Sequence, residues 1–391
     1  MRRRVGIGLV GFGWMGQAHS RSYRRIPMLF PERGADPELV ICSDTVTARA
    51  QDAVGSFGFR EASADWRRVV EHPEVDAVVV TAPNMLHVEI VEAAAAAGKH
   101  VFCEKPVGGT PAQTVRAAVA TRRAGVITGV GYNYRFTPLV RYTAQLIRDG
   151  ALGQITNYRG RFFSMYGSDP LGILSWRFQL DQAGYGVSTD LLSHAVDLAH
   201  MLIGPIVRLV GMRATFIAER PLPQPGAGTH YGRGDPGDPT GPVTNEDYVG
   251  LLAEFAGGVL GTFESSRTLV GPESQMAFDV YGTRGAASWN LERLNELQLC
   301  LADDAAHTGY TTVLGGDRFP YHGSFVPGTG NGIGFEDMIA IEDYEFLQSV
   351  ARDAPHEPGF EAALEYVAVQ DALVRSWESG RWEDVKPLEE E

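Results

Sequence analysis

Cysteine is scarce in this chain of 391 residues: there are three, Cys42, Cys103 and Cys300, widely spaced and in apolar contexts. Such spacing builds neither a disulfide framework nor a zinc site, so we expect reduced core residues of a cytoplasmic protein. Basic residues are also in deficit, with 34 lysines and arginines against 48 acids and a net charge of −14. This charge argues against nucleic acid and anionic membranes as partners. No apolar run approaches the length needed to span a bilayer.

Length and patterning together predict two domains, because a chain of this size exceeds one ordinary core. Residues 1–135 alternate strands and helices, which is typical of an α/β, doubly wound (Rossmann) domain with a mainly parallel sheet. Residues 136–391 predict an α+β domain on a large, mainly antiparallel sheet. Its expected strands are 155–163, 207–216, 248–255, 258–264, 276–281 and 286–291, and its expected helices 138–149, 335–350 and 360–376. Residues 220–243, rich in proline and glycine, predict a long surface loop or an oligomer arm.

A glycine-rich turn joins the first strand to the first helix. Residues 5–10 predict a strand that is apolar throughout, without alternation of apolar and polar residues. It leads into Gly11-Phe12-Gly13-Trp14-Met15-Gly16, and a helical pattern follows through Tyr23. In a dinucleotide loop the first glycine permits the tight turn, the second lets the pyrophosphate approach, and the third lets helix and strand pack closely. The alternative is a glycine-rich turn without a ligand. We predict cofactor contacts from Gly11, Phe12, Gly13, Trp14 and Met15.

An acid, Asp44, ends the second strand, residues 39–43. Such an acid accepts the ribose hydroxyls of adenosine and repels a 2′-phosphate, so we predict NAD rather than NADP. The alternative role is a helix N-cap, because a helical pattern begins at Thr45, and both roles are compatible. Asp44 lies farther than usual from the glycines, and a loop over residues 27–37 is expected to account for the excess.

Four residues after the strand 77–80, where the crevice is expected, are predicted to contact the cofactor. They are Thr81, Pro83, Asn84 and His87, and Asn84 is also predicted to cap the alanine-rich helix that runs to Ala97. For His87, a helix-start histidine without a chemical role is as plausible as a cofactor contact.

The strand 101–103 ends abruptly in Glu104-Lys105-Pro106. A lysine at the carboxyl end of a parallel strand points into the crevice where such sheets bind ligands. Proline restricts Lys105 to extended geometry and so holds its ammonium group in place. The competing interpretation is an ordinary surface lysine.

In the second domain, Asp190, His194 and Asp197 are spaced i, i+4 and i+7, so we expect them on one face of an otherwise apolar helix. Two carboxylates flanking a buried imidazole favour proton transfer. A structural histidine–aspartate pair and a capping role for Asp190 are the alternatives. A metal site is not expected, because His200 has the wrong spacing to share this face.

These three separated motifs together resemble the glucose–fructose oxidoreductase/inositol dehydrogenase (Gfo/Idh/MocA) family, over essentially the whole chain. The resemblance implies an NAD(P)-dependent dehydrogenase of an unphosphorylated sugar or cyclitol, assembled as a homodimer or homotetramer through its open sheet face. By the same resemblance Lys105, Asp190 and His194 are catalytic, and they also contact substrate. The resemblance also places Glu104, Asn84 and His87 near the nicotinamide and its ribose. It places Trp176, Arg177, Asn133 and Arg135 near the substrate. Lys105 and Asn133 are implied to contact the cofactor as well.

The chemistry of the residues fits that reaction. Oxidising a secondary alcohol needs a base for the hydroxyl proton, and His194 suits it. Lys105 can stabilise the alkoxide and lower the pKa of His194. Asp190 would hold either the substrate hydroxyl or the Lys105–His194 pair in position. Two other functions remain open: an NAD-dependent glycosidase or eliminating enzyme, and a non-catalytic NAD-binding regulator.

Overall fold

Six parallel strands form the first sheet, in the order β3-β2-β1-β4-β5-β6. The computed structural model describes residues 2–223, 232–302 and 308–389. The strands are β1 (Arg3–Val10), β2 (Ala35–Ser43), β3 (Glu61–Ser63), β4 (Ala77–Val80), β5 (His100–Cys103) and β6 (Thr128–Val130). The helices are α1 (Trp14–Leu29), α2 (Thr47–Gly55), α3 (Arg67–Glu71), α4 (His87–Ala96) and α5 (Pro111–Ala124). The strand order reverses between β1 and β4, which is where doubly wound sheets open a ligand crevice.

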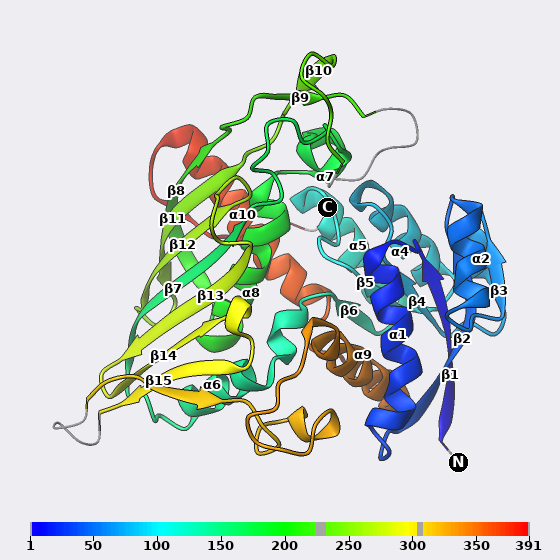
Figure 1. Cartoon of the computed structure of the whole chain (residues 1–391), viewed down its shortest axis with the longest axis horizontal. Helices are drawn as coiled ribbons and strands as arrows, with labels where there is room; N and C mark the ends of the chain where they lie inside the picture. Colours follow the sequence, from blue (N-terminus) through cyan, green and yellow to red (C-terminus); the bar gives the residue numbers. More distant parts are fainter. Residues whose placement is uncertain (1, 224–231, 303–307, 390–391) are drawn as a thin grey trace.

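Nine strands form the second sheet, in the order β16-β15-β14-β13-β7-β12-β11-β8-β17. Only β7 and β12 pair in parallel, so the predicted mainly antiparallel sheet is confirmed. Its strands are β7 (Ile155–Ser164), β8 (Ile206–Ala214), β11 (Tyr248–Phe255), β12 (Leu260–Ser266), β13 (Ser274–Gly282), β14 (Gly285–Asn290), β15 (Glu296–Leu301), β16 (Thr311–Leu314) and β17 (Glu383–Asp384). The two sheets stand side by side, the parallel one on the right of Figure 1.

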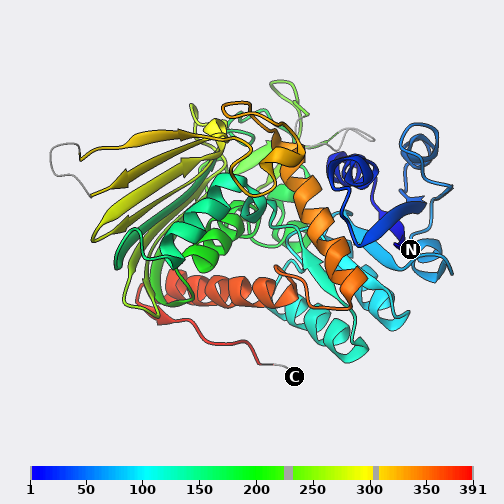
Figure 2. The same cartoon turned by 90° about the horizontal axis from the view of Figure 1, so that it is seen from below.

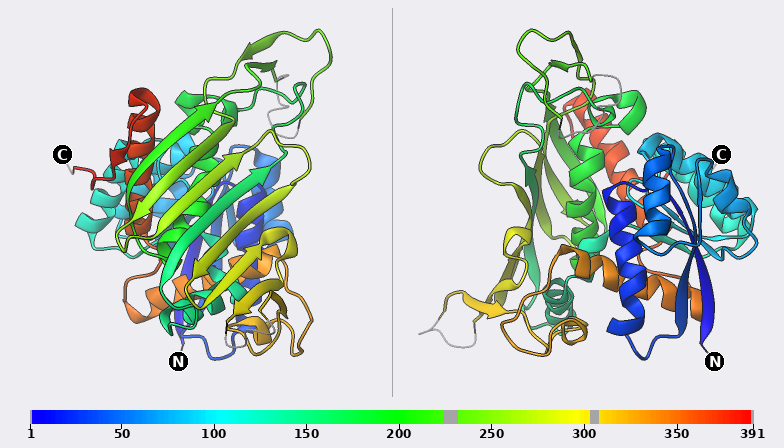
Figure 3. Two further views of the ribbon diagram at one scale, coloured as in Figure 1. Left: turned by 90° about the vertical axis from the view of Figure 1, so that its left-hand side faces the viewer. Right: turned by 45° about the vertical axis from the view of Figure 1, so that its right-hand side comes forward.

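Helices cover one face of the nine-stranded sheet. They are α6 (Pro138–Arg148), α8 (Ser193–Leu202) and α10 (Phe360–Ser379), which Figure 2 shows along the side that faces the first domain. The opposite face is bare of other elements in the view of Figure 3, left. Burial follows this asymmetry: on β7, Tyr158 is buried while Asn157 and Arg159 are exposed.

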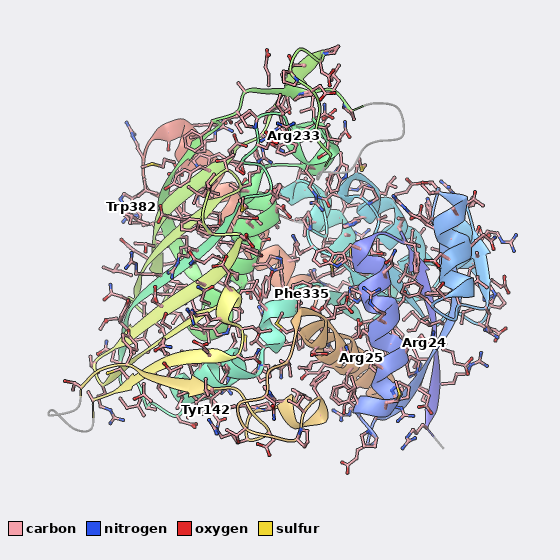
Figure 4. The ribbon with its side chains drawn as sticks, viewed as in Figure 1. Arg24, Arg25, Tyr142, Arg233, Phe335 and Trp382 are labelled. Atoms are coloured by element: carbon pink, nitrogen blue, oxygen red, sulfur yellow. The ribbon has the colours of Figure 1, made fainter. Side chains whose placement is uncertain are left out.

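The helix α9 (Phe335–Arg352) lies beside α1 although more than 300 residues separate their starts (Figures 1 and 4). Its Ile341, Phe346 and Leu347 belong to the same buried cluster as Val5 and Ile7 of β1. A helix from the predicted second domain thus completes the core of the first, and the division at residue 135 stays a prediction.

One predicted loop is wrong. Residues 27–37 are not an irregular connection, since α1 continues through Pro27 to Leu29 and β2 begins at Ala35. A proline removes one helical hydrogen bond, but α1 buries Tyr23 and Ile26 immediately before it, and this packing outweighs the loss.

The proline- and glycine-rich segment 220–243 also differs from a plain loop. It contains most of a small antiparallel pair, β9 (Glu219–Pro221) with β10 (Thr240–Pro242). Residues 224–231 of this segment lie outside the described residues. The short strands β3, β15 and β16 are additions that the sequence patterns do not predict. In the described part of the chain, no helix is both long and apolar enough to cross a bilayer.

Candidate active site

The glycine loop has the form that a dinucleotide needs. Gly11 has φ +95, and a Cβ there would lie 2.7 Å from the backbone of Ala82. A Cβ on Gly16 would lie 2.1 Å from the carbonyl oxygen of Gly11, so strand and helix pack with no room for a side chain. A Cβ on Gly13 would meet no atom within 4 Å. Open space at Gly13, directly before the amino terminus of α1, fits a pyrophosphate.

Asp44 is tied to this loop. Its Oδ2 accepts a hydrogen bond from the backbone N–H of Phe12, at 2.8 Å, and its Oδ1 accepts one from Val46, also at 2.8 Å. It is half-buried and directly follows β2. The alternative role as helix N-cap is wrong, because α2 begins at Thr47 and Val46 holds the capping position. A carboxylate offers about four lone-pair sites, so these two bonds leave capacity for ribose hydroxyls.

The polar residues after β4 are held by neighbouring loops. Thr81 Oγ1 donates to the carbonyl of Gly11 at 2.5 Å. His87 is fully buried, with its ring nitrogens 2.7 Å from the carbonyl oxygens of Pro106 and Ala82, and burial lowers its pKa. Both nitrogens of His87 are therefore engaged by the protein.

Asn84 does not cap the alanine-rich helix as predicted. It begins a 3₁₀ turn (Asn84–Leu86), and its side-chain amide donates to the carbonyl of Ala183 at 3.1 Å. The helix α4 starts only at His87. Asn84 instead links the crevice to the second domain, while Pro83 directly precedes this turn.

Glu104 and Asn133 are buried and follow the carboxyl ends of β5 and β6. Glu104 is 8% exposed; its Oε2 accepts from the backbone N–H of Lys105 at 3.2 Å, and its Oε1 lies 3.2 Å from His19 Nε2. Asn133 is buried, and its Nδ2 has no hydrogen-bond partner among the described residues. An unsatisfied buried amide is costly, so a bound ligand is a suitable partner for it.

Asp190 is the centre of a polar cluster. Its Oδ1 accepts a hydrogen bond from Lys105 Nζ at 2.8 Å, and its Oδ2 accepts one from the hydroxyl of Tyr166 at 2.9 Å. Arg177 Nη1 lies 3.7 Å from Oδ1, and the Arg177 guanidinium lies 4.4 Å from the centre of the Trp176 ring. Burial raises the pKa of Asp190, but Lys105 and Arg177 outweigh burial and hold the pKa well below its usual range. The carboxylate is therefore charged, and it orients the lysine.

His194 begins the first turn of α8 and is 6% exposed. Its Nδ1 is enclosed and has no hydrogen-bond partner among the described residues, while the ring of Tyr134 lies 4.7 Å away. Burial, and then the charge of Lys105, hold the pKa of His194 well below its usual value. A neutral imidazole can accept a proton at neutral pH.

Of the two carboxylates expected to flank His194, neither forms a hydrogen bond with it among the described residues. Asp190 bonds Lys105 and Tyr166, and Asp197 forms a buried pair with Arg135, with Nη2 to Oδ1 at 2.6 Å. Asp190 precedes α8 in the π-helix Ser188–Leu192, whose wider turn changes its phase relative to the α-helical residues that follow. Asp197 lies in α8 itself, and Arg135 of the 3₁₀ turn Asn133–Phe136 engages its carboxylate. The same pair engages the guanidinium of Arg135, which was predicted to face substrate.

Tyr166 is the site residue that the sequence reasoning missed. It follows β7 by two residues and belongs to no motif, so only its approach to Asp190 in the folded chain identifies it. Among the described residues no group of three potential ligands could hold a metal ion.

Two family models match the chain: "Oxidoreductase family, NAD-binding Rossmann fold" over residues 5–132, and "GFO/IDH/MocA C-terminal domain" over residues 140–288. Levoglucosan dehydrogenase of Pseudarthrobacter phenanthrenivorans is 35% identical over 388 residues, covering 98% of this chain and 99% of that protein. Inositol 2-dehydrogenase of Rhizobium meliloti is 26% identical over 375 residues, covering 95% and 96%.

Solved structures agree with these matches. Levoglucosan dehydrogenase in complex with NADH and levoglucosan has a TM-score of 0.92 at 33% identity, covering 99% of this chain and 100% of that one. The same protein with NADH alone also has a TM-score of 0.92, at 34% identity, with the same coverage. The first domain is thus an NAD-binding Rossmann domain, and the similar proteins are dehydrogenases of sugars and cyclitols.

Proposed function

Because this chain belongs to the Gfo/Idh/MocA family of NAD-binding oxidoreductases, we propose that it oxidises a secondary hydroxyl of an unphosphorylated sugar or cyclitol with NAD. The observation that carries this proposal is the Lys105–Asp190 pair, 2.8 Å long, in a site with the neutral imidazole of His194. A cofactor-binding regulator needs the dinucleotide loop but has no need of a proton-transfer set.

The residues divide the reaction between them. The loop from Gly11 to Met15, with Asp44 and Asn133, would hold NAD, which supplies the two-electron acceptor when bound. His194 takes the hydroxyl proton at Nε2, because its other ring nitrogen, Nδ1, is enclosed. Lys105 Nζ donates a hydrogen bond to the same substrate oxygen and stabilises its developing negative charge.

Asp190 and Arg177 set the charge at this site. Asp190 keeps the ammonium group of Lys105 in position and remains charged while doing so. The positive charge of Lys105 in turn helps to keep the imidazole of His194 free of a proton before the reaction begins. Trp176 and Arg177 supply a flat surface with polar groups, which suits a sugar ring.

For the substrate, we propose an anhydrosugar of the levoglucosan type. The support is the full-length similarity to levoglucosan dehydrogenase, which exceeds the similarity to the inositol and xylose dehydrogenases. We further propose that the protein acts in the cytoplasm, since the three cysteines are free. We propose a homodimer or homotetramer formed through the bare sheet face.

The test is a screen of levoglucosan, inositols, xylose and glucose with NAD and with NADP, read as NADH or NADPH absorbance. We expect net NADH formation, strongest with levoglucosan. The Lys105→Met variant serves as the control and should be inactive. Substrate cleavage or elimination without net NADH would instead identify the glycosidase or eliminating enzyme. Tight NAD binding with no turnover of any compound would identify the regulator.

A further inference from the structure

Arg220 is a buried cation outside the catalytic cluster. It lies on β9, is 1% exposed, and forms no ion pair within the described residues. Its Nη1 donates to the carbonyl oxygen of Asp169 at 2.9 Å, and its Nη2 donates to that of Gly167. Burying a guanidinium group is costly, so its retention here calls for a role. Its hydrogen bonds all go to the backbone of residues 165–178, which we name the wall segment.

The wall segment carries two of the three groups that contact Asp190. Tyr166 donates to Asp190 Oδ2, and the guanidinium of Arg177 lies 3.7 Å from Oδ1. Phe178, which follows Arg177, is held by two cations: the guanidinium carbon atoms of Arg220 and Arg267 lie 4.0 and 4.4 Å from its ring centre.

Arg267 fixes the wall segment from the side of the nine-stranded sheet. It is fully buried, pairs with Asp247 at 2.8 Å, and donates to the carbonyl oxygen of Arg177 at 3.2 Å. The carbonyl oxygen of Arg267 also accepts a hydrogen bond from the N–H of Gly167 at 2.8 Å. Arg220 reaches the same segment from the small β9–β10 pair. Among the described residues Arg267 has a carboxylate partner and Arg220 has none.

The small β9–β10 pair, with the described residues beside it, forms an arm (219–223 and 232–242) that is joined to the wall segment by main-chain bonds. The N–H of Leu174 donates to the carbonyl of Pro221 at 2.7 Å, and that of Ile173 donates to Gly232 at 3.1 Å. On the solvent side, Arg233 pairs with Asp169 at 2.8 Å, and both side chains are about half exposed. Figure 4 shows Arg233, a residue of the arm, in the upper part of the molecule.

We propose that Arg220 is a positioning residue for substrate selectivity: it locks the arm to the wall segment and thereby holds Tyr166 and Arg177 against Asp190. This inference rests on the proposed sugar dehydrogenase function. Polar groups discriminate between sugars only when they are fixed, because a shift of about 1 Å in a reacting geometry can cost roughly 100-fold in rate. The glycine loop that binds NAD lies in the other domain, so cofactor affinity is independent of the arm.

The test is a double-mutant cycle between Arg220→Met and Tyr166→Phe, with Arg233→Met as the matched control. We expect each of the first two changes to raise KM for the sugar roughly 10- to 100-fold and to reduce discrimination between the two best sugars of the screen. NAD affinity should stay within about twofold, and the double variant should be little worse than the worse single one. Arg233→Met should behave like the unaltered protein, because exposed pairs contribute little.

Additive effects in this cycle, an unchanged KM in Arg220→Met, or loss of NAD binding would overturn the proposal. If Arg220→Met does not fold, Arg220→Lys replaces it, since lysine keeps the charge but not the planar fork of donors. Hydrogen exchange provides a test that needs no substrate. The amides of Ile173 and Leu174 should exchange faster in the Arg220 variant than in Arg233→Met, and equal exchange would refute the lock even if no sugar were oxidised.

Discussion

At the scale of single residues, Lys105 and His194 form one unit with Asp190. Lys105→Met and His194→Ala should each reduce kcat by roughly 10²–10⁴-fold, the usual contribution of a positioned proton-transfer group. The double variant should be little worse than the worse single one, because residues that act as a unit are not additive. Dissociation constants for NADH, measured by fluorescence, should change little. Activity retained in both single variants would remove this mechanism, and NADH binding lost in both would make the residues structural.

Cofactor choice depends on one carboxylate, Asp44. NAD should be preferred, since Asp44 repels a 2′-phosphate, and Asp44→Ser should narrow the ratio of kcat/KM between NAD and NADP. The variant also removes a hydrogen bond to the N–H of Phe12, so binding of both cofactors should weaken. The ratio of the two kcat/KM values is therefore the quantity to measure. Comparable values for both cofactors in the unaltered protein would contradict the assignment.

The sequence predicted which residues gather at the site better than it predicted their partners. The family resemblance placed Lys105 and Asp190 in one catalytic set, and they lie 2.8 Å apart. The pairing of Asp197 with Arg135 was not predictable, since it joins α8 to a 3₁₀ turn 62 residues earlier in the chain. Tyr166 was not identified as a site residue for a related reason, because a long-range contact leaves no local pattern in the sequence.

At the scale of elements, local patterns located most helices and strands, and β11 has its predicted bounds, residues 248–255. The strand β16 was missed because it has only four residues and lies at the sheet edge, where burial imposes less pattern. Nothing in the periodicity of α9 indicates that it packs on α1 rather than on its own sheet. That choice is made by complementary side chains, such as Arg25 of α1 and Asp337 of α9, 2.5 Å apart.

A buried histidine joins α1 to α9. His19 is fully enclosed, with Nδ1 2.9 Å from Asp343 Oδ1 and Nε2 3.2 Å from Glu104 Oε1. Burial lowers the pKa of His19, but Asp343 and then Glu104 outweigh it and hold the pKa well above 6.5. Two further groups face this cluster: burial and then neighbouring charge raise the pKa of Glu342 and of Tyr23.

This arrangement predicts how stability depends on pH. Because the pKa of His19 is raised by folding, its contribution is complete below pH 6.5 and is lost as pH rises through the folded-state pKa. Asp343→Asn should cost roughly 1–3 kcal/mol at neutral pH, and the gap to the unaltered protein should narrow as the pH rises. Urea unfolding from pH 6 to pH 9 measures both curves. A gap that stays constant or widens with pH would show that His19 is not charged in the folded protein.

At the scale of the whole molecule, the bare face of the nine-stranded sheet is the expected interface between subunits. Leu252 of β11 and Leu260 of β12 lie on that face and are 51% and 55% exposed. Met212 of β8 pairs with Gly250 in the same register, so its side chain, 66% exposed, is on the same face. Arg159 and Glu264 are interspersed among these apolar side chains. Large sheets rarely leave such a face in water, and in a symmetric dimer opposite charges can pair across it.

We therefore expect a homodimer or homotetramer formed sheet to sheet. Leu260→Glu should shift the assembly toward monomer, because it introduces like charges beside Glu254 across the strand pair and again across the two-fold axis. Sedimentation velocity at micromolar concentration measures the distribution. Met28→Glu is the matched control, since Met28 is 76% exposed but lies at the end of α1 in the other domain, and it should leave assembly unchanged. A single species of 42.5 kDa in the unaltered protein would rule out the oligomer. An oligomer indifferent to Leu260→Glu but broken by Met28→Glu would place the interface on the first domain instead.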